Sequence, residues 1–170
     1  EDIRIHVTSE TGLRRQVDEL VTHADALQFA DPRWREELGR WLGQGAFGDS
    51  WLMAKVSQLA VTYLNLARST AKKDSELLHS ASALGVITLA QPDPAGQIRV
   101  GRVFERVFLM ATALDIDLQP MNQILQVPEV RQRFVDLLPP EWGRPQLTFR
   151  LGFAEPEQHT PRRPLETVLE

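Results

Sequence analysis

The apolar positions near the N-terminus recur first every second residue and then every three to four residues. Ile3, Ile5 and Val7 alternate with polar residues, which predicts a half-buried strand with His6 facing away from the core. From Thr11 the period lengthens, which predicts an amphipathic helix with charged residues on its other face. The apolar positions of this helix are Leu13, Val17, Leu20, Val21, Ala24 and Leu27.

Two more helical segments follow. Asp31 and Pro32 are residue types of an N-cap and a first helical turn, and the helix that they predict ends among three glycines. Asp49 or Ser50 suits the cap of a further, strongly apolar helical segment over residues 51–67. A helix this apolar is covered either by the protein's own core or by a partner. The first of the two helices has Trp34, Leu38, Trp41 and Leu42 on one side and Gly43, Gly45 and Gly48 at its end.

The middle of the chain contains the most continuous apolar run. Residues 83–89 are nearly all apolar, which is typical of a strand buried on both faces, and we expect this strand at the centre of a sheet. Residues 91–96 include two prolines and a glycine and interrupt the pattern. Apolar residues then recur at helical spacing from Val100 to Leu114, which predicts a long helix with a wide apolar stripe.

The C-terminal part is predicted to hold one more helix and one more strand. Residues 118–123 have the composition of a turn, residues 128–138 of a helix, and residues 147–153 of a strand, after which residues 154–170 form an extended arm. Three strands separated by long helical stretches predict an α+β layered fold, with a mixed sheet of few strands flanked by long helices. We expect residues 1–170 to form a single domain or half-domain.

Composition restricts the classes of function. The 170 residues suffice for one domain with a real core, and the net charge of −4 argues against a nucleic-acid partner. The absence of cysteine excludes thiol catalysis and cysteine-ligated metals. No apolar run approaches a membrane span and the start at Glu1 lacks a signal pattern, so we expect a cytoplasmic protein with no membrane partner. Because residue 1 is not methionine, we expect a trimmed chain, a processed chain or a segment of a longer one.

No catalytic or metal-binding motif is present in the sequence. The four histidines lack the paired spacing of a zinc site, and there is no nucleophile elbow, phosphate-binding loop or dinucleotide fingerprint. The chain is therefore either a binding module or an enzyme whose cofactor performs the chemistry. The histidines are His6, His23, His79 and His159.

The C-terminal arm contains two adjacent arginines between two prolines. Pro161 and Pro164 restrict the backbone around Arg162 and Arg163, which keeps the pair extended. Each planar guanidinium group suits a phosphate or a carboxylate. An ordinary solvated arginine pair near a terminus is the alternative interpretation.

Three segments, read in order, resemble a known family. They are similar to the C-terminal half of nitroreductase-like FMN proteins, and closest to the long single-chain, Acg-type branch of that family. The resemblance covers residues 81–169, is weaker over residues 31–41 and does not extend to residues 44–76. The segments are GRVFERVFLMA at 101–111, QPMNQ at 119–123 and PRRPLETVL at 161–169.

The resemblance implies FMN as the cofactor. In this family the long central helix packs at the core of a dimer or pseudo-dimer, and the turn after it presents backbone N–H groups to the flavin ring, which assigns Asn122 and Gln123. A basic residue of the C-terminal arm reaches the FMN phosphate, which assigns Arg162 with Arg163 as the alternative. The cofactor-binding residues so implied are Pro120, Met121, Asn122, Gln123, Arg162 and Arg163.

The sequence also departs from the family pattern. Members begin with an arginine-rich motif that supplies most of the phosphate contacts, and here Arg14-Arg15 lack its serine pattern. A flavin site built from this chain alone would therefore lack half of its walls. The explanations are a removed N-terminal half, a separate subunit, or a half-domain without its own flavin.

The function implied is that of an FMN-dependent NAD(P)H oxidoreductase of nitroreductase type, in which this chain contributes one side of a shared flavin site. Its partners would be NAD(P)H, a nitroaromatic or quinone-like acceptor, and either a second copy in a homodimer or an N-terminal half or second subunit. One alternative is a non-catalytic protein that binds or sequesters flavin. Another is a structural dimerisation half without its own flavin.

Overall fold

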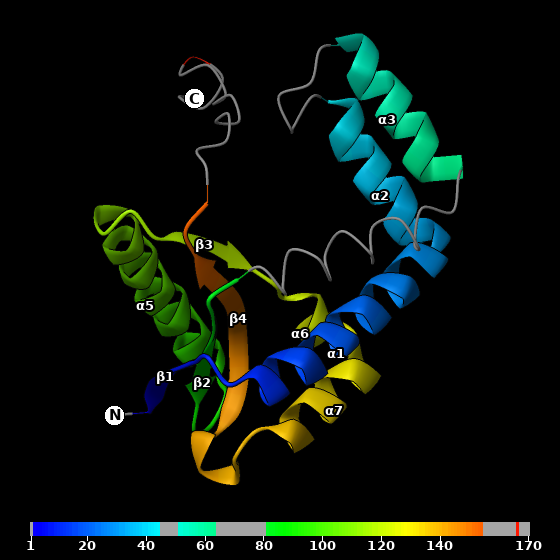
Figure 1. Ribbon diagram of the computed structural model, residues 1–170. Coiled ribbons are helices and arrows are strands. Elements are labelled where there is room, and N and C mark those ends of the chain that lie inside the picture. The colour runs from blue at the N-terminus through cyan, green and yellow to red at the C-terminus, as the bar shows by residue number, and fades with distance from the viewer. Residues whose placement is uncertain (1, 45–50, 64–80, 155–165, 167–170) are drawn as a thin grey trace. The chain divides into compact units, whose positions relative to one another are not determined.

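The computed structural model describes residues 2–44, 51–63, 81–154 and 166. Over those residues it has four strands and six α-helices, which confirms the predicted α+β fold (Figure 1). The strands are β1 (Ile3–Thr8), β2 (Ala83–Leu89), β3 (Asp117–Pro120) and β4 (Arg144–Gly152). The helices are α1 (Thr11–Ala30), α2 (Pro32–Gly43), α3 (Trp51–Tyr63), α5 (Pro94–Ala113), α6 (Gln123–Gln126) and α7 (Pro128–Leu137), with a 3-10 turn over Pro140–Trp142.

These elements group in two compact units. The described part of the first unit has residues 2–27 and 81–154, which include the sheet, most of α1, and helices α5, α6 and α7. The described part of the second unit has residues 28–44, 51–63 and 166, which include α2 and α3. The turn that the resemblance assigns to a flavin thus belongs to the first unit.

The sheet is antiparallel at every pairing, in the order β1-β2-β4-β3. Strand β2 lies inside the sheet and is buried from Leu84 to Leu89, which confirms the prediction of a central strand covered on both faces. The prediction of a mixed sheet is wrong. The direction of a strand depends on the edge of the sheet at which the preceding connection returns the chain. Here the connections place every pair of neighbouring strands in opposite directions.

The alternating side chains of β2 divide between two cores. Leu84 and Val86 join apolar residues of α1, α6 and α7 on one face of the sheet. Ile87 joins Val100 of α5 and Phe149 of β4 on the other face. Helices therefore cover both faces, with α5 on one and α1, α6 and α7 on the other (Figure 1).

Strand β1 forms where the sequence predicts it, but the side that it buries differs from the prediction. Ile5 and Val7 remain 47% and 59% exposed, because β1 is an edge strand that α5 leaves uncovered. His6 was expected to face away from the core, and that expectation is wrong. Its ring stacks on Trp142 with the ring centroids 4.0 Å apart, and its Nε2 lies 3.1 Å from Oγ1 of Thr88. Trp142 belongs to a turn that is distant in the sequence, so the local pattern around His6 does not predict that Trp142 covers it.

Strand β3 is the element that the sequence does not predict. The segment expected to be a turn, residues 118–123, begins instead with strand residues that pair with β4, Gln119 opposite Arg150 and Pro120 opposite Phe149. Pro120 is the last residue of an edge strand, where a missing N–H costs no ladder hydrogen bond. Because the pairing depends on β4, the local sequence shows little sign of it.

Helix starts follow local chemistry. The Asp31 carboxylate caps α2 as predicted, with Pro32 in the first turn. Helix α5 begins inside the segment that appeared to be an interruption, because the carboxylate of Asp93 caps it. The predicted caps Asp49 and Ser50 lie outside the described residues.

Helices α2 and α3 pack side by side as an antiparallel pair within the second unit (Figure 1). Gly39 of α2 permits the close approach, since a Cβ at this position would collide with the hydroxyl of Thr62 on α3. Ala54 and Val61 of α3 are buried. The pair thus has a small core of its own.

Candidate functional site

The turn that the resemblance assigns to a flavin follows β3 at the edge of the sheet. Pro120 ends β3, and Met121 is buried in the core shared with α1, α6 and α7. The N–H of Met121 donates to the carbonyl oxygen of Thr148 at 2.8 Å, and the Thr148 hydroxyl donates to the Met121 carbonyl oxygen. Met121 therefore holds the turn against β4, and its N–H is already used.

Asn122 makes a second connection between the turn and β4. Its side-chain Oδ1 accepts a hydrogen bond from the N–H of Thr148 at 3.0 Å. Its backbone carbonyl accepts from Leu125 and Gln126, which closes the first turn of α6. Because Oδ1 is the acceptor, the Nδ2 amide of the same side chain remains a donor.

Gln123 is the first residue of α6 and is partly buried. The first N–H groups of a helix have no acceptor within that helix, so the turn carries backbone donors at this position. The resemblance assigns these donors to the flavin ring. Whether they meet a flavin stays a prediction.

Arg150 is a neighbour of the turn that sequence reasoning did not nominate. It lies opposite Gln119 in the pairing of β3 with β4, and its Nε donates to the Gln119 side-chain oxygen at 2.8 Å. A strand pattern with one basic residue among apolar ones was its only signal in the sequence. Arg162 and Arg163, the predicted phosphate ligands, lie outside the residues that the structure describes.

An open groove of about 490 Å³ lies between β1, α5 and β4 on the α5 side of the sheet. Among the described residues that line it, Arg106 is the one that carries a charge. Ile5 and Val7, which the strand pattern expected to be buried, form the β1 side of this groove. The groove is therefore suited to an apolar partner, and its lining offers few groups for catalysis.

Helix α5 and the residue after it expose large apolar side chains, of which Met110 and Leu114 also line this groove. Five large apolar residues at or next to the ends and outer side of the helix are between 42% and 70% exposed. Four of the five lie within about two turns at the C-terminal end of the helix, and exposed apolar side chains gathered in this way mark an interaction site. We call this set, which surrounds the C-terminal end of the helix apart from Ile98 near its start, the α5 face: Ile98, Phe108, Leu109, Met110 and Leu114.

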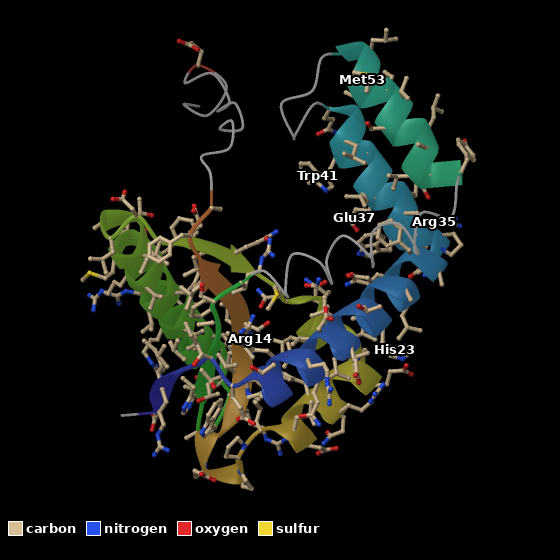
Figure 2. All side chains as sticks on the ribbon, viewed as in Figure 1. Arg14, His23, Arg35, Glu37, Trp41 and Met53 are labelled. Carbon is tan, nitrogen blue, oxygen red and sulfur yellow. The ribbon has the colours of Figure 1, made fainter. Side chains whose placement is uncertain are left out.

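Within the described ranges there is no group of three or more His, Cys, Asp or Glu residues that could hold a metal ion. His23 of α1 (Figure 2) pairs with Glu129 on the surface at 3.2 Å. His6 is stacked on Trp142, so neither histidine forms part of an acid–base cluster. His79 and His159 lie outside the described residues. In the same part of the chain, every helix is too short or too polar to cross a membrane.

Comparisons of the chain with protein-family models, with curated proteins and with solved structures found no match. The resemblance to nitroreductase-like proteins therefore rests on the sequence of residues 101–111, 119–123 and 161–169.

Proposed function

We propose that this chain contributes one side of an FMN site in a nitroreductase-type NAD(P)H oxidoreductase of the cytoplasm. The other side would come from a second copy, from a second subunit or from an N-terminal half. The observation that carries the proposal is the uncovered α5 face, with its outer residues such as Leu109 and Met110 more than 60% exposed. In the family that the sequence resembles, this helix packs at the core of a dimer or pseudo-dimer. A face of this kind requires such cover.

The donors of the turn suit the polar edge of a flavin ring. Two hydrogen bonds with Thr148 of β4 hold the turn in one conformation before any ligand arrives. The N–H of Met121 donates to the Thr148 carbonyl oxygen, and Oδ1 of Asn122 accepts from the Thr148 N–H. Such preorganisation lowers the entropic cost of binding. The donors that remain are the first N–H groups of α6 and the Asn122 side-chain amide. Met121 is a positioning residue, because its N–H is already used.

When bound, FMN would supply the chemistry, taking hydride from NAD(P)H and passing electrons to a nitroaromatic or quinone-like acceptor. The residues of this chain bind and orient. Amide donors at Asn122 and Gln123 favour the negative charge that develops on the ring. Arg162, or Arg163 in its place, pairs with the phosphate. No side chain is assigned as a general acid or base.

Two other functions agree with the same uncovered face. A protein that binds or sequesters flavin without catalysis would need the same turn, and a structural half would need the α5 face alone. Flavin content separates the structural half from the other two. Oxidation of NAD(P)H in the presence of a quinone or nitroaromatic then separates the enzyme from the flavin store.

The test is a titration of the full chain with FMN, alone and together with the N-terminal half or second subunit. Quenching of the flavin fluorescence reports the binding. We expect stoichiometric binding and release of FMN on denaturation. Failure to bind FMN in either form of the protein would contradict the proposal. Binding without NAD(P)H oxidation would leave the flavin store as the function.

Substitution of the arginine pair tests the phosphate contact. Arg162→Ala should weaken FMN binding by about 1.5–3 kcal/mol, the range for a charged hydrogen bond, while the circular dichroism spectrum stays unchanged. The matched control is Arg133→Ala, an exposed arginine of α7, which should leave the affinity as it is. Equal affinity in wild type, Arg162→Ala and Arg163→Ala would show that the arm does not bind the phosphate.

A further inference from the structure

Helix α3 exposes four apolar residues that lie along one side of the helix. Leu52, Val56, Leu59 and Tyr63 are 65%, 51%, 59% and 76% exposed, and we call them the α3 stripe. They are separated by four, three and four residues. This alternation of four and three is the spacing of the contact positions of a coiled coil.

The opposite side of α3 is already in use. Ala54 and Val61 are buried, and Gly39 and Gly43 of α2 leave room for the side chains of α3 at close approach. The α3 stripe therefore lies on the side that α2 does not cover. Lys55 is the only charged residue of the helix. A helix that is apolar on two sides needs cover on both.

The spacing of the stripe allows a second copy of α3 to pair with it. The stripe is symmetric about the point between Ser57 and Gln58, so that an antiparallel copy of α3 would place Leu52 opposite Tyr63 and Val56 opposite Leu59. Large side chains would then meet large ones over the whole length. Two-fold pairing of identical surfaces is the commonest way in which proteins self-associate.

The single charge favours the same direction. In a parallel pair the two Lys55 ammonium groups would lie at the same height beside each other. In an antiparallel pair they are displaced along the axis by about 7 Å and lie beside uncharged residues. The antiparallel arrangement thus avoids the repulsion of like charges at short range.

We propose that α3 pairs in an antiparallel manner with α3 of a second copy of this chain, so that two α2–α3 pairs form a four-helix arrangement. Met53, next to the stripe at the start of α3 (Figure 2), is 53% exposed and would extend the contact. The area buried would be on the order of 1,000 Å² in total, which is near the lower limit for a specific interface. The dimer is therefore weak and concentration-dependent. The proposal does not depend on FMN or on the α5 face.

Cysteine cross-linking tests the direction as well as the contact. The chain has no cysteine of its own, so introduced thiols report without background. A mixture of full-length Leu52→Cys and Tyr63→Cys proteins should form a disulfide-linked heterodimer under mild oxidation. Leu52→Cys alone should give at least tenfold less dimer, because its two thiols would be about 16 Å apart along the axis.

A charged residue introduced into the α3 stripe also tests the pairing of two copies of α3. Leu59→Arg should weaken self-association at least tenfold in sedimentation equilibrium and abolish the mixed cross-link, with an unchanged circular dichroism spectrum because Leu59 is exposed. The control is Gln132→Arg, which places the same charge on the exposed side of α7, away from both the α3 stripe and the α5 face, and should leave the cross-link intact.

Three results would overturn the proposal. A mixed sample that gives no cross-link would show that the stripe faces something other than α3, including another part of its own chain. Efficient cross-linking of Leu52→Cys with itself would show a parallel pair. A cross-link that survives Leu59→Arg would show that the contact does not use the stripe.

Discussion

His6, Thr88 and Trp142 join the N-terminal strand to the turn after α7 through one chain of hydrogen bonds. The Thr88 hydroxyl donates to the carbonyl oxygen of Trp142, so it accepts from Nε2 of His6. This assigns the hydrogen of the neutral imidazole to Nε2. Burial lowers the pKa of His6 below 6.5, the hydrogen bond to the Trp142 backbone raises it, and the charge of Arg4 lowers it, with a net lowering.

This lowered pKa predicts a loss of stability in mild acid. The unfolded chain, in which the pKa of His6 is near 6.5, takes up a proton more readily than the folded chain, so the contribution of His6 is fully present above pH 6.5 and is lost as the pH falls through the folded-state pKa. The free energy of unfolding, from urea titrations at pH 7.5 and pH 5.5, should fall less in His6→Phe than in the wild type. Phenylalanine keeps the ring stack on Trp142 but does not titrate.

The control for this experiment is His23→Gln, which removes an exposed histidine paired with Glu129. It should leave the difference between the two pH values close to that of the wild type. If His6→Phe lost as much stability as the wild type over the same interval, protonation of His6 would not be the cause.

At the scale of elements, the pairing of β2 with β4 depends on the absence of a side chain. Gly85 lies directly opposite Phe149, and the fully buried aromatic ring occupies the space where a Cβ of residue 85 would be. A large ring over a glycine fills the α5-side core without forcing the strands apart. This explains a glycine inside an otherwise apolar strand.

Gly85→Ala should therefore destabilise the protein by about 1–3 kcal/mol, because a buried ring has no room to move aside. Gly152→Ala, also in the sheet, should be tolerated, since a Cβ added at residue 152 would lie 3.5 Å from its nearest neighbour, the backbone N of Ser82, which is an ordinary contact distance. Thermal unfolding followed by circular dichroism measures both. Equal melting temperatures of the two variants would contradict this account of the strand pairing.

The elements that the sequence predicts best are those with local causes. Helix α1 follows from its apolar period, α2 from the Asp31 cap, and β2 from its continuous apolar run. The site is predicted less completely. The turn containing Asn122 was located, but its hydrogen bond to Thr148, the use of the Met121 N–H and the neighbouring Arg150 all depend on β4.

At the scale of the whole molecule, the two compact units have cores of different size. The first unit buries large side chains on both faces of the sheet, among them Phe134 and Phe149, whereas the buried residues described in α2 and α3 are the small ones Gly39, Ala54 and Val61. Local stability depends on the apolar area that an element buries. The α2–α3 pair is thus held together by less buried apolar area than the first unit.

Hydrogen exchange should show this difference. We expect the amides of β2 to exchange only through global unfolding, and those in the middle of α2 and α3 to exchange at least tenfold faster. Mass spectrometry of peptides from the two regions, at a concentration where the protein is monomeric, measures both rates. Equal protection of β2 and α3 would show that the protein opens as one cooperative unit.

The sequence by itself determined the class of fold, most of the helices and the central strand. Apolar period and capping residues act over one or two helical turns, so neighbouring residues contain that information. Tertiary structure alone decided that β3 is a strand, that the sheet is antiparallel, and that His6 rather than Ile5 and Val7 is covered. Each of these features depends on which distant segment packs against the residues concerned. The exposed apolar side chains of α5 and α3 likewise follow from the tertiary structure, because it decides which side chains other segments cover.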